Sequence, residues 1–305
     1  MPSELILIQL NLRFNVTNIS LKRLVQNHLM RSAYLILLTF VINNTFSQLY
    51  TGVIKDATTD MPLAFVNIGI PKKATGTVSQ FDGTFRLTIA EENTPDTLRI
   101  SMIGYKTKEI PVKILNSDYF ILNKAITLEP DIKELSEVII RPRNMKEVVL
   151  GNENNSPNVS AGFLTDDLGS ELGTVMKLKD GKTYYLKSCG FNFAKVNYDS
   201  IIFRVNIYDL EDGLPGELLI SLPIYVTVYR DQRNVIVDLY PYDIKIEEDF
   251  VLSLEWLQDL PDKTKAVMFC AGFFGNKVVF RQTSQANWAG FPIGIGIWCK
   301  AEFEK

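Results

Sequence analysis

Side chains able to carry out chemistry are few in this sequence, and they are widely spaced. Histidine occurs once in 305 residues, at His28. A Ser-His-Asp triad, a Cys-His pair and a His-ligated zinc or iron site all need an imidazole inside the folded domain. We therefore expect no histidine-dependent or zinc-dependent catalysis, and we assign no catalytic, cofactor-binding or metal-ligating residue. No cofactor is expected.

The three cysteines lie in the second half of the chain, at Cys189, Cys270 and Cys299, without CxxC or another close metal-ligand spacing. Cys189 shares a predicted strand face with Phe191 and Phe193, and Cys299 shares one with three isoleucines. Cysteine packs in cores as a small hydrophobe. The pattern predicts buried free thiols. One structural disulfide between two of them, in an oxidising compartment, is the alternative.

Paired carboxylates are the remaining route to catalysis, because glycosidases use them without histidine. Glu255 beside Trp256 is the most suggestive local pair. Neighbours in a strand point to opposite faces, so the two would not share a site. We expect Glu255 to face solvent. The acidic stretches Asp166-Asp167 and Asp209 to Asp212 lack the calcium-loop pattern and are expected to be solvated turns.

Two tryptophans are candidate binding rings, since exposed indoles stack on sugars or partner side chains. Trp298 shares a predicted strand face with Lys300 and Glu302, which favours exposure. Trp288 lies in a turn-like stretch, 284–290. The favoured interpretation is that they cover the core or a sheet edge, with a ligand-binding role as the alternative.

The elements that must position these side chains follow a distinct leader. Arg31 precedes an apolar run at 33–42, and Thr45 and Ser47 fit the −3 and −1 positions of a cleavage site. This predicts a secretory signal peptide over 1–47. The run is too short for a spanning helix, which needs ~20 residues, so no transmembrane span is expected in the mature chain. Met30 is an alternative start, and a true N-terminal extension or anchor is the other alternative.

Residues 48–129 alternate apolar and polar side chains in short bursts. Phe85, Leu87 and Ile89 are one such burst. A period of two over four to seven residues indicates half-buried strands. Asp82-Gly83 is the sharpest turn signal, because glycine accepts the positive φ of a tight hairpin. Six or seven strands in about eighty residues predict an antiparallel sandwich.

The same stretch resembles the carboxypeptidase regulatory-like domain family in the order and spacing of its runs at 52–56, 58–68, 76–79, 81–85, 96–98 and 103–105. The resemblance implies a seven-stranded, prealbumin-like sandwich. That domain is non-catalytic in metallocarboxypeptidases, whose zinc site belongs to a separate domain. In Gram-negative bacteria it also precedes the plug of TonB-dependent outer-membrane receptors. The resemblance therefore implies an envelope context and no carboxypeptidase activity.

A linker is predicted at 130–160, where 135–140 is similar to the stretch before a receptor plug and 151–162 is rich in Asn, Ser, Gly and Pro. Alternation resumes over 161–305. Phe203, Val205 and Ile207 oppose Arg204, Asn206 and Tyr208, and the apolar face of 293–303 includes Cys299. This predicts a second, jelly-roll-like sandwich of eight or nine strands.

The sequence thus predicts an all-β protein of two antiparallel β-sandwiches. Its net charge of −3 gives no basic footprint for nucleic acid. We expect a non-enzymatic exported protein that binds or scaffolds in the cell envelope, in the periplasm, at the outer membrane or on the cell surface. Its expected partner is an envelope protein or a glycan. The alternative is a carbohydrate-active jelly-roll enzyme, which would show a cleft lined by paired carboxylates and exposed aromatic rings.

Overall fold

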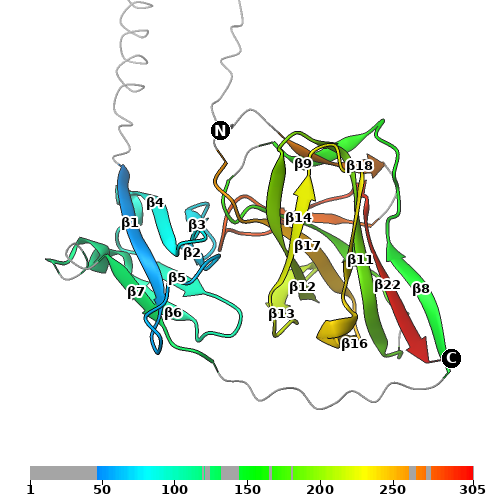
Figure 1. Cartoon of the computed structure of the whole chain (residues 1–305), viewed down its shortest axis with the longest axis horizontal. Coiled ribbons are helices and arrows are strands. Elements are labelled where there is room, and N and C mark those ends of the chain that lie inside the picture. Colours follow the sequence, from blue (N-terminus) through cyan, green and yellow to red (C-terminus); the bar gives the residue numbers. More distant parts are fainter. Residues whose placement is uncertain are drawn as a thin grey trace, which may run out of the picture. The chain divides into compact units, whose positions relative to one another are not determined.

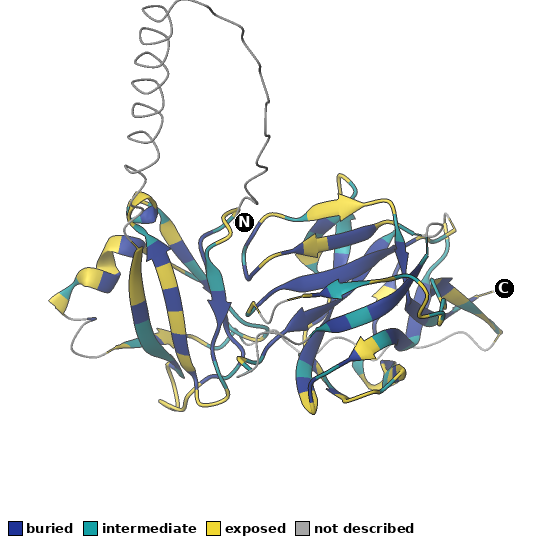
Figure 2. Cartoon of the chain, turned by 90° about the horizontal axis from the view of Figure 1, so that it is seen from above, coloured by how far each residue is buried: buried dark blue, intermediate teal, exposed yellow. Residues whose placement is uncertain are grey.

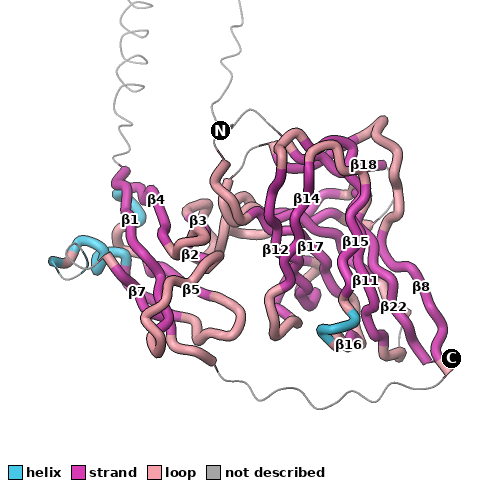
Figure 3. Tube along the Cα trace, in the orientation of Figure 1, coloured by secondary structure: helices cyan, strands magenta, loops and turns pink. Residues whose placement is uncertain are grey.

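The computed structural model describes residues 47–118, 120, 124–131, 144–164, 167–179, 181–260, 266–272 and 276–304. They belong to one compact unit, Ser47–Lys305. Strands dominate it, with short 3-10 segments at Glu91–Asn93 (η1), Val112–Asn116 (η2) and Tyr240–Tyr242 (η3) (Figures 1 and 3). None of its described helical segments is long and apolar enough to cross a membrane. The predicted signal peptide lies outside the described residues, apart from Ser47.

The first sandwich is built from two small sheets. The three-stranded sheet has the order β4-β1-β7, with β1 (Ser47–Asp56), β4 (Thr84–Ala90) and β7 (Ala125–Leu128). The four-stranded sheet has the order β3-β2-β5-β6, with β2 (Asn67–Gly69), β3 (Gly76–Val78), β5 (Thr97–Ser101) and β6 (Lys108–Pro111). The pairing of β1 with β7 is parallel, and the other pairings are antiparallel. The predicted all-β sandwich is confirmed.

The predicted alternation sets the core of this sandwich. Phe85, Leu87 and Ile89 of β4 are buried, whereas the residues between them are exposed; Figure 2 shows such bands along the strands. Gly83 has the expected positive φ of 76°. The predicted hairpin is wrong, however, because the turn joins β3 to β4, which belong to different sheets. The turn carries the chain from one layer to the other.

The second sandwich has a seven-stranded and an eight-stranded sheet. The first has the order β13-β12-β17-β10-β19-β20 with β14 beside β12, comprising β10 (Glu171–Met176), β12 (Ser200–Glu211), β13 (Leu214–Leu218), β14 (Ile224–Tyr229), β17 (Phe250–Trp256), β19 (Val278–Arg281) and β20 (Ala289–Phe291). The second has the order β21-β18-β11-β22-β8, comprising β8 (Met145–Gly151), β9 (Ser160–Phe163), β11 (Tyr184–Val196), β15 (Asn234–Asp238), β16 (Lys245–Ile246), β18 (Val267–Gly272), β21 (Gly294–Ile295) and β22 (Ile297–Glu304).

These sheets contain more strands than the eight or nine predicted, because long strands pair with several short ones. β11, for example, pairs with β15, β16, β18 and β22. One of the additional strands lies inside the predicted linker. Residues Met145–Gly151 form β8 and pair antiparallel with β22. The second sandwich therefore begins before residue 161, while 132–143 lie outside the described residues.

The core of the second sandwich is aromatic. Phe163, Phe203 and Trp256 pack together, with ring centroids 5.4–5.6 Å apart. Cys189 and Cys299 face each other across β11 and β22, and all three cysteines are free and buried, as predicted.

The side chain of Trp298 is buried, which agrees with the favoured interpretation of core cover and differs from the exposure that its strand face suggested. The physical reason is Gly190 on β11. A Cβ there would lie 2.1 Å from the indole ring, so the missing side chain makes room for the ring.

Thiol labelling checks this core. Burial raises the pKa of the Cys189 and Cys299 thiols, so both stay protonated in the folded protein. We expect Cys299 to react slowly with a thiol-reactive dye under native conditions and quickly in urea, with Cys299→Ser identifying its signal. Rapid native labelling of Cys299 would contradict the inward register of β22.

Candidate functional site

One face of the seven-stranded sheet is covered by the first sandwich. Along β17, Leu252, Leu254 and Trp256 face the core of the second sandwich, whereas Ser253 and Glu255 lie on the opposite face and are also fully buried. The covering contact, here called the seam, joins Phe65, Asn67, Gly69, Gly76, Val78 and Ser101 of the first sandwich to Arg204, Leu257, Ser284 and Gln285 of the second.

Backbone packs directly against backbone at the seam. The Lys72 amide donates to the Gln285 carbonyl over 2.9 Å, and the Gln285 side-chain amide donates to Ser101 Oγ over 3.0 Å. At Gly76 a Cβ would lie 2.1 Å from the Ser284 carbonyl oxygen, and at Gly69 it would lie 2.6 Å away. Only glycine therefore fits at these two positions without moving one sandwich away from the other.

A row of four buried charged residues crosses the covered face. Arg204, Glu255, Glu171 and Arg281 are successive cross-strand partners on β12, β17, β10 and β19. Arg204 Nη2 lies 2.6 Å from Glu255 Oε2, and Arg281 Nη2 lies 2.6 Å from Glu171 Oε2. This set, called the charge row below, places two carboxylates side by side between two guanidinium groups.

Neutral side chains add hydrogen bonds to three of the four carboxylate oxygens, whereas Glu255 Oε1 has no hydrogen-bond partner and lies 3.6 Å from Arg281 Nη2. Asn206 Nδ2 donates to Glu171 Oε1 and to Glu255 Oε2, each over 2.9 Å. Ser253 Oγ donates to Glu171 Oε1, and the Tyr208 hydroxyl donates to Glu171 Oε2 over 3.2 Å. Buried ions are tolerated only when such partners replace the lost water. The arrangement is that of an internal ion network.

Arg204 also connects the charge row to the first sandwich. Its Nη1 donates to the Phe65 carbonyl over 2.9 Å, and its Nη2 donates to Asn67 Oδ1. Phe65 has a φ of 62°, a left-handed conformation that a bulky side chain rarely adopts. The Phe65 amide is held by the Ser79 carbonyl at 2.9 Å. Arg204 is thus an ion-pair partner within its own sheet and a hydrogen-bond donor across the seam.

The two carboxyl groups have opposite pKa shifts. Burial dominates at Glu171 and raises its pKa above the ordinary 4.5, despite the nearby Arg281 guanidinium. Burial also opposes ionisation of Glu255, but Arg204 and Arg281 together outweigh it and lower the pKa of Glu255.

These shifts predict opposite pH trends for two matched variants. Stabilisation from Glu171 is present below about pH 4.5 and is lost as pH rises through its raised pKa. The free energy of unfolding of Glu171→Gln, relative to the wild type, should therefore rise with pH. Stabilisation from Glu255 is present above about pH 4.5 and is lost as pH falls through its lowered pKa. The free energy of unfolding of Glu255→Gln, relative to the wild type, should therefore fall with rising pH. Urea unfolding from about pH 3 to about pH 8 measures both. Parallel trends would contradict the assignment.

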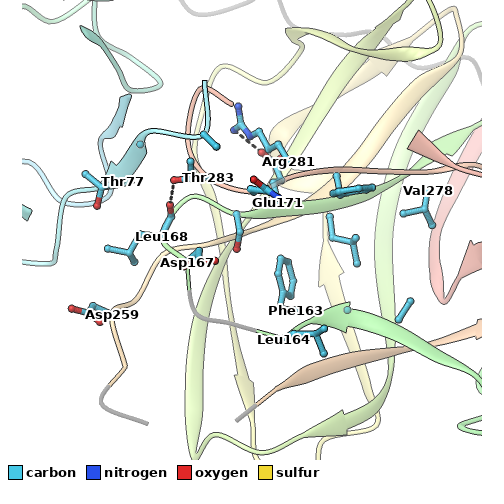
Figure 4. A pocket seen from close by; sticks show the side chains of 18 of the residues that line it. Thr77, Phe163, Leu164, Asp167, Leu168, Glu171, Asp259, Val278, Arg281 and Thr283 are labelled. Carbon is cyan, nitrogen blue, oxygen red and sulfur yellow. Dashed lines mark hydrogen bonds and ion pairs between the residues drawn. The ribbon is translucent and has the colours of Figure 1, made fainter. Parts of the chain in front are cut away.

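Two hollows flank the charge row. The larger, called the seam groove, has a volume of about 1320 Å³ and is lined by Gly76, Thr77, Arg86 and Thr88 of the first sandwich and by Phe163, Leu164, Glu171, Phe280, Arg281 and Phe291 of the second. In Figure 4, Thr77 lies across this groove from Phe163 and Leu164, and Arg281 reaches Glu171. Leu164 and Phe291 are well exposed, at 70% and 60%.

The smaller hollow, called the seam pocket, has a volume of about 510 Å³. Its lining is mainly polar and includes Asn67, Arg99 and Ser101 of the first sandwich and Arg204, Asn206, Tyr208, Glu217, Arg281 and Gln285 of the second. Arg281 borders both hollows. Its guanidinium carbon lies 4.9 Å from the centre of the Trp288 ring, which packs edge-on against Tyr208.

The structure corrects one sequence-based candidate and places the others. Glu255 is fully buried, so its predicted solvent exposure is wrong; the first sandwich covers the face that was expected to be open. Asp209 accepts a hydrogen bond from the Glu217 amide over 2.6 Å and shapes the β12–β13 turn. Asp167 is exposed, and Asp166 lies outside the described residues. Trp288 is half-buried beside Arg281.

Sequence reasoning missed Glu171, Arg204, Asn206 and Arg281 as a group. A signal was present, because Arg204 and Asn206 interrupt a strand whose other face is wholly apolar. Within the described part of the chain, no three His, Cys, Asp or Glu side chains gather closely enough to hold a metal ion. The absence of zinc stays a prediction.

Comparison with known proteins identifies the first sandwich. The fold and the seam define a β protein of two sandwiches. Residues 50–140 match the family model of the CarboxypepD_reg-like domain. This stretch is therefore a carboxypeptidase regulatory-like domain, and the resemblance drawn from the sequence is confirmed. The chain is also 34% identical over 96 residues to the TonB-dependent receptor SusC of Bacteroides thetaiotaomicron. That match covers 29% of this chain and 9% of the receptor.

Similarity to solved structures is slight. The VP2 subviral particle of infectious bursal disease virus aligns with 84% of this chain and 63% of its own, at 8% identity and a TM-score of 0.24. The Gt strain of the same virus aligns at 8% identity and a TM-score of 0.25, over 84% of this chain and 62% of its own. These scores are too low to support any conclusion about the second sandwich.

Proposed function

We propose that this chain is an exported, non-enzymatic protein of the cell envelope that binds or scaffolds an envelope protein or a glycan. The CarboxypepD_reg-like domain and the identity with a TonB-dependent receptor support the envelope context. Because the chain spans only 9% of that receptor, the receptor's own activity is not transferred. Periplasmic, outer-membrane-associated and surface positions all agree with this proposal.

The charge row is the observation that carries the non-enzymatic part of the proposal. An acid–base pair needs carboxyl groups that reach a substrate with their protonation states free to change. Here Glu255 is bound by Arg204 and Asn206, and Glu171 by Arg281, Asn206, Ser253 and Tyr208. Glu255 Oε2 and both Glu171 oxygens are committed to structural partners, which favours a binding or scaffolding protein over a carbohydrate-active enzyme.

The seam groove supports the binding part. Both sandwiches contribute to its walls, which combine the exposed side chains of Leu164 and Phe291 with polar groups such as Thr77 and Arg86. Ligand sites commonly lie in hollows between domains, with apolar walls and a few polar groups. A partner bound there would contact the regulatory-like domain and the second sandwich together.

The test combines location with activity. The full-length chain, expressed in a Gram-negative host, is expected in the envelope fraction, beginning near Gln48 by intact mass. Purified protein is expected to release no sugar from a polysaccharide panel and no C-terminal residue from peptides. Cytoplasmic retention, or turnover abolished by Glu171→Gln in a folded protein, would contradict the proposal.

A further inference from the structure

The seam pocket has the composition of a site for an acidic ligand. It is lined by three arginines, Arg99, Arg204 and Arg281, and by one carboxylate, Glu217. We propose that it binds a small acidic sugar, a uronate-type ligand whose carboxylate faces the arginines and whose hydroxyl groups meet the neutral polar lining. This inference rests on the proposed binding function and names a ligand class for it.

The placement of charges separates the pocket from the charge row behind it. Glu255 holds Arg204, and Glu171 holds Arg281, yet neither carboxylate is among the pocket's lining residues. The pocket therefore borders the two arginines but not their negative partners. Arg99 pairs with Glu109 over 2.8 Å at a half-exposed position. Exposed pairs of this kind are weak, so Arg99 is free to turn toward an anion.

Arg281 borders the pocket and carries a buried donor without a partner. Its side chain is 9% exposed, and its Nε has no hydrogen-bond partner. A buried N–H without an acceptor costs free energy, and an acceptor atom from a ligand removes that cost. The guanidinium carbon also lies within cation–π distance of the Trp288 ring, at 4.9 Å from its centre. Guanidinium groups held in this way bind carboxylates by charge-assisted hydrogen bonds.

The remaining lining favours a sugar over a simple anion. Internal hydrogen bonds use Asn67 Oδ1, Asn206 Nδ2 and Gln285 Nε2. The other amide atoms of these three residues and the Ser101 hydroxyl hydrogen still offer both donors and acceptors. Sugar hydroxyl groups also offer both. A hollow of about 510 Å³ lies within the usual size range of small-molecule sites, roughly 300–1,000 Å³.

The experiment is calorimetric titration of the mature chain with two matched sugars, glucuronate and glucose, which differ only in the carboxylate. Glucuronate is expected to bind at least about tenfold more tightly, the scale of a hydrogen bond to a charged group. Arg99→Gln should weaken glucuronate binding by about three- to fivefold, and Glu217→Gln should strengthen it by a similar factor. Arg230→Gln, at an exposed position that borders neither hollow, is the matched control and should change nothing.

Equal binding of the two sugars, or of neither, would overturn the inference, as would an effect of Arg230→Gln equal to that of Arg99→Gln. Tighter binding of inorganic sulfate than of glucuronate would overturn the sugar part. These failures differ from failure of the proposed function, because envelope location and absence of turnover are read in separate assays. Unchanged urea midpoints of the surface variants show that altered binding is not altered folding.

Discussion

Arg204→Met is expected to lower the free energy of unfolding by about 3–5 kcal/mol, the usual result of removing one partner of a buried ion pair. Glu255 would be left buried beside Glu171 with its strongest partner gone. The Phe65 carbonyl and the Asn67 side chain would also lose their donor across the seam. Urea unfolding followed by tryptophan fluorescence measures the change.

The chain offers a matched control in Arg230, which pairs with Asp199 over 2.5 Å at an exposed position. Arg230→Met should cost about 1 kcal/mol or less. The double variant Arg204→Met/Glu255→Met removes both charges and should recover much of the loss, because apolar side chains of similar volume often replace a buried pair without cost. Equal effects of Arg204→Met and Arg230→Met would contradict the structural role of the charge row.

Gly76→Ala is expected to open the seam. The added Cβ would lie 2.1 Å from the Ser284 carbonyl oxygen. The Cβ has a position fixed by the backbone and the oxygen is a backbone atom, so neither can rotate away. We expect a loss of about 2–3 kcal/mol, the upper range for overpacking. Because each sandwich keeps its own core, the single unfolding transition should split into two.

Gly104→Ala is the control for that variant. Nothing lies within 4 Å of a Cβ at Gly104, but its φ of 84° is unfavourable for alanine. It should cost about 1–2 kcal/mol through backbone strain alone and keep a single transition. A single transition in Gly76→Ala, at the wild-type midpoint, would contradict the packing of Ser284 on Gly76.

Period-two patterning was sufficient to predict the strands and the inward faces that hold Phe85 and Cys299. It was insufficient for Glu255 and Arg204. Within one strand, a polar residue on the second face gives the same alternating sequence pattern whether water or another sandwich covers that face. The cover comes from residues 65–78, more than a hundred positions earlier in the chain, and no local pattern encodes that contact.

Trp298 and the strand count show the same limit on a smaller scale. The burial of Trp298 depends on Gly190, which stands opposite it on another strand. The extra strands arise because β11 and β12 are long enough to pair with several partners. Register between strands decides both outcomes, and a single sequence indicates the strands more readily than their register.

The most direct test of the account is the distance between the two sandwiches in solution. Spin labels at Lys113→Cys and Ile236→Cys occupy exposed positions on the first and second sandwich, and the buried native cysteines should stay unlabelled. Pulsed electron–electron double resonance should give one narrow distance distribution in the otherwise unchanged protein and a broad one after Gly76→Ala. A broad distribution without that substitution would contradict the claim that the seam joins the two sandwiches into one binding unit.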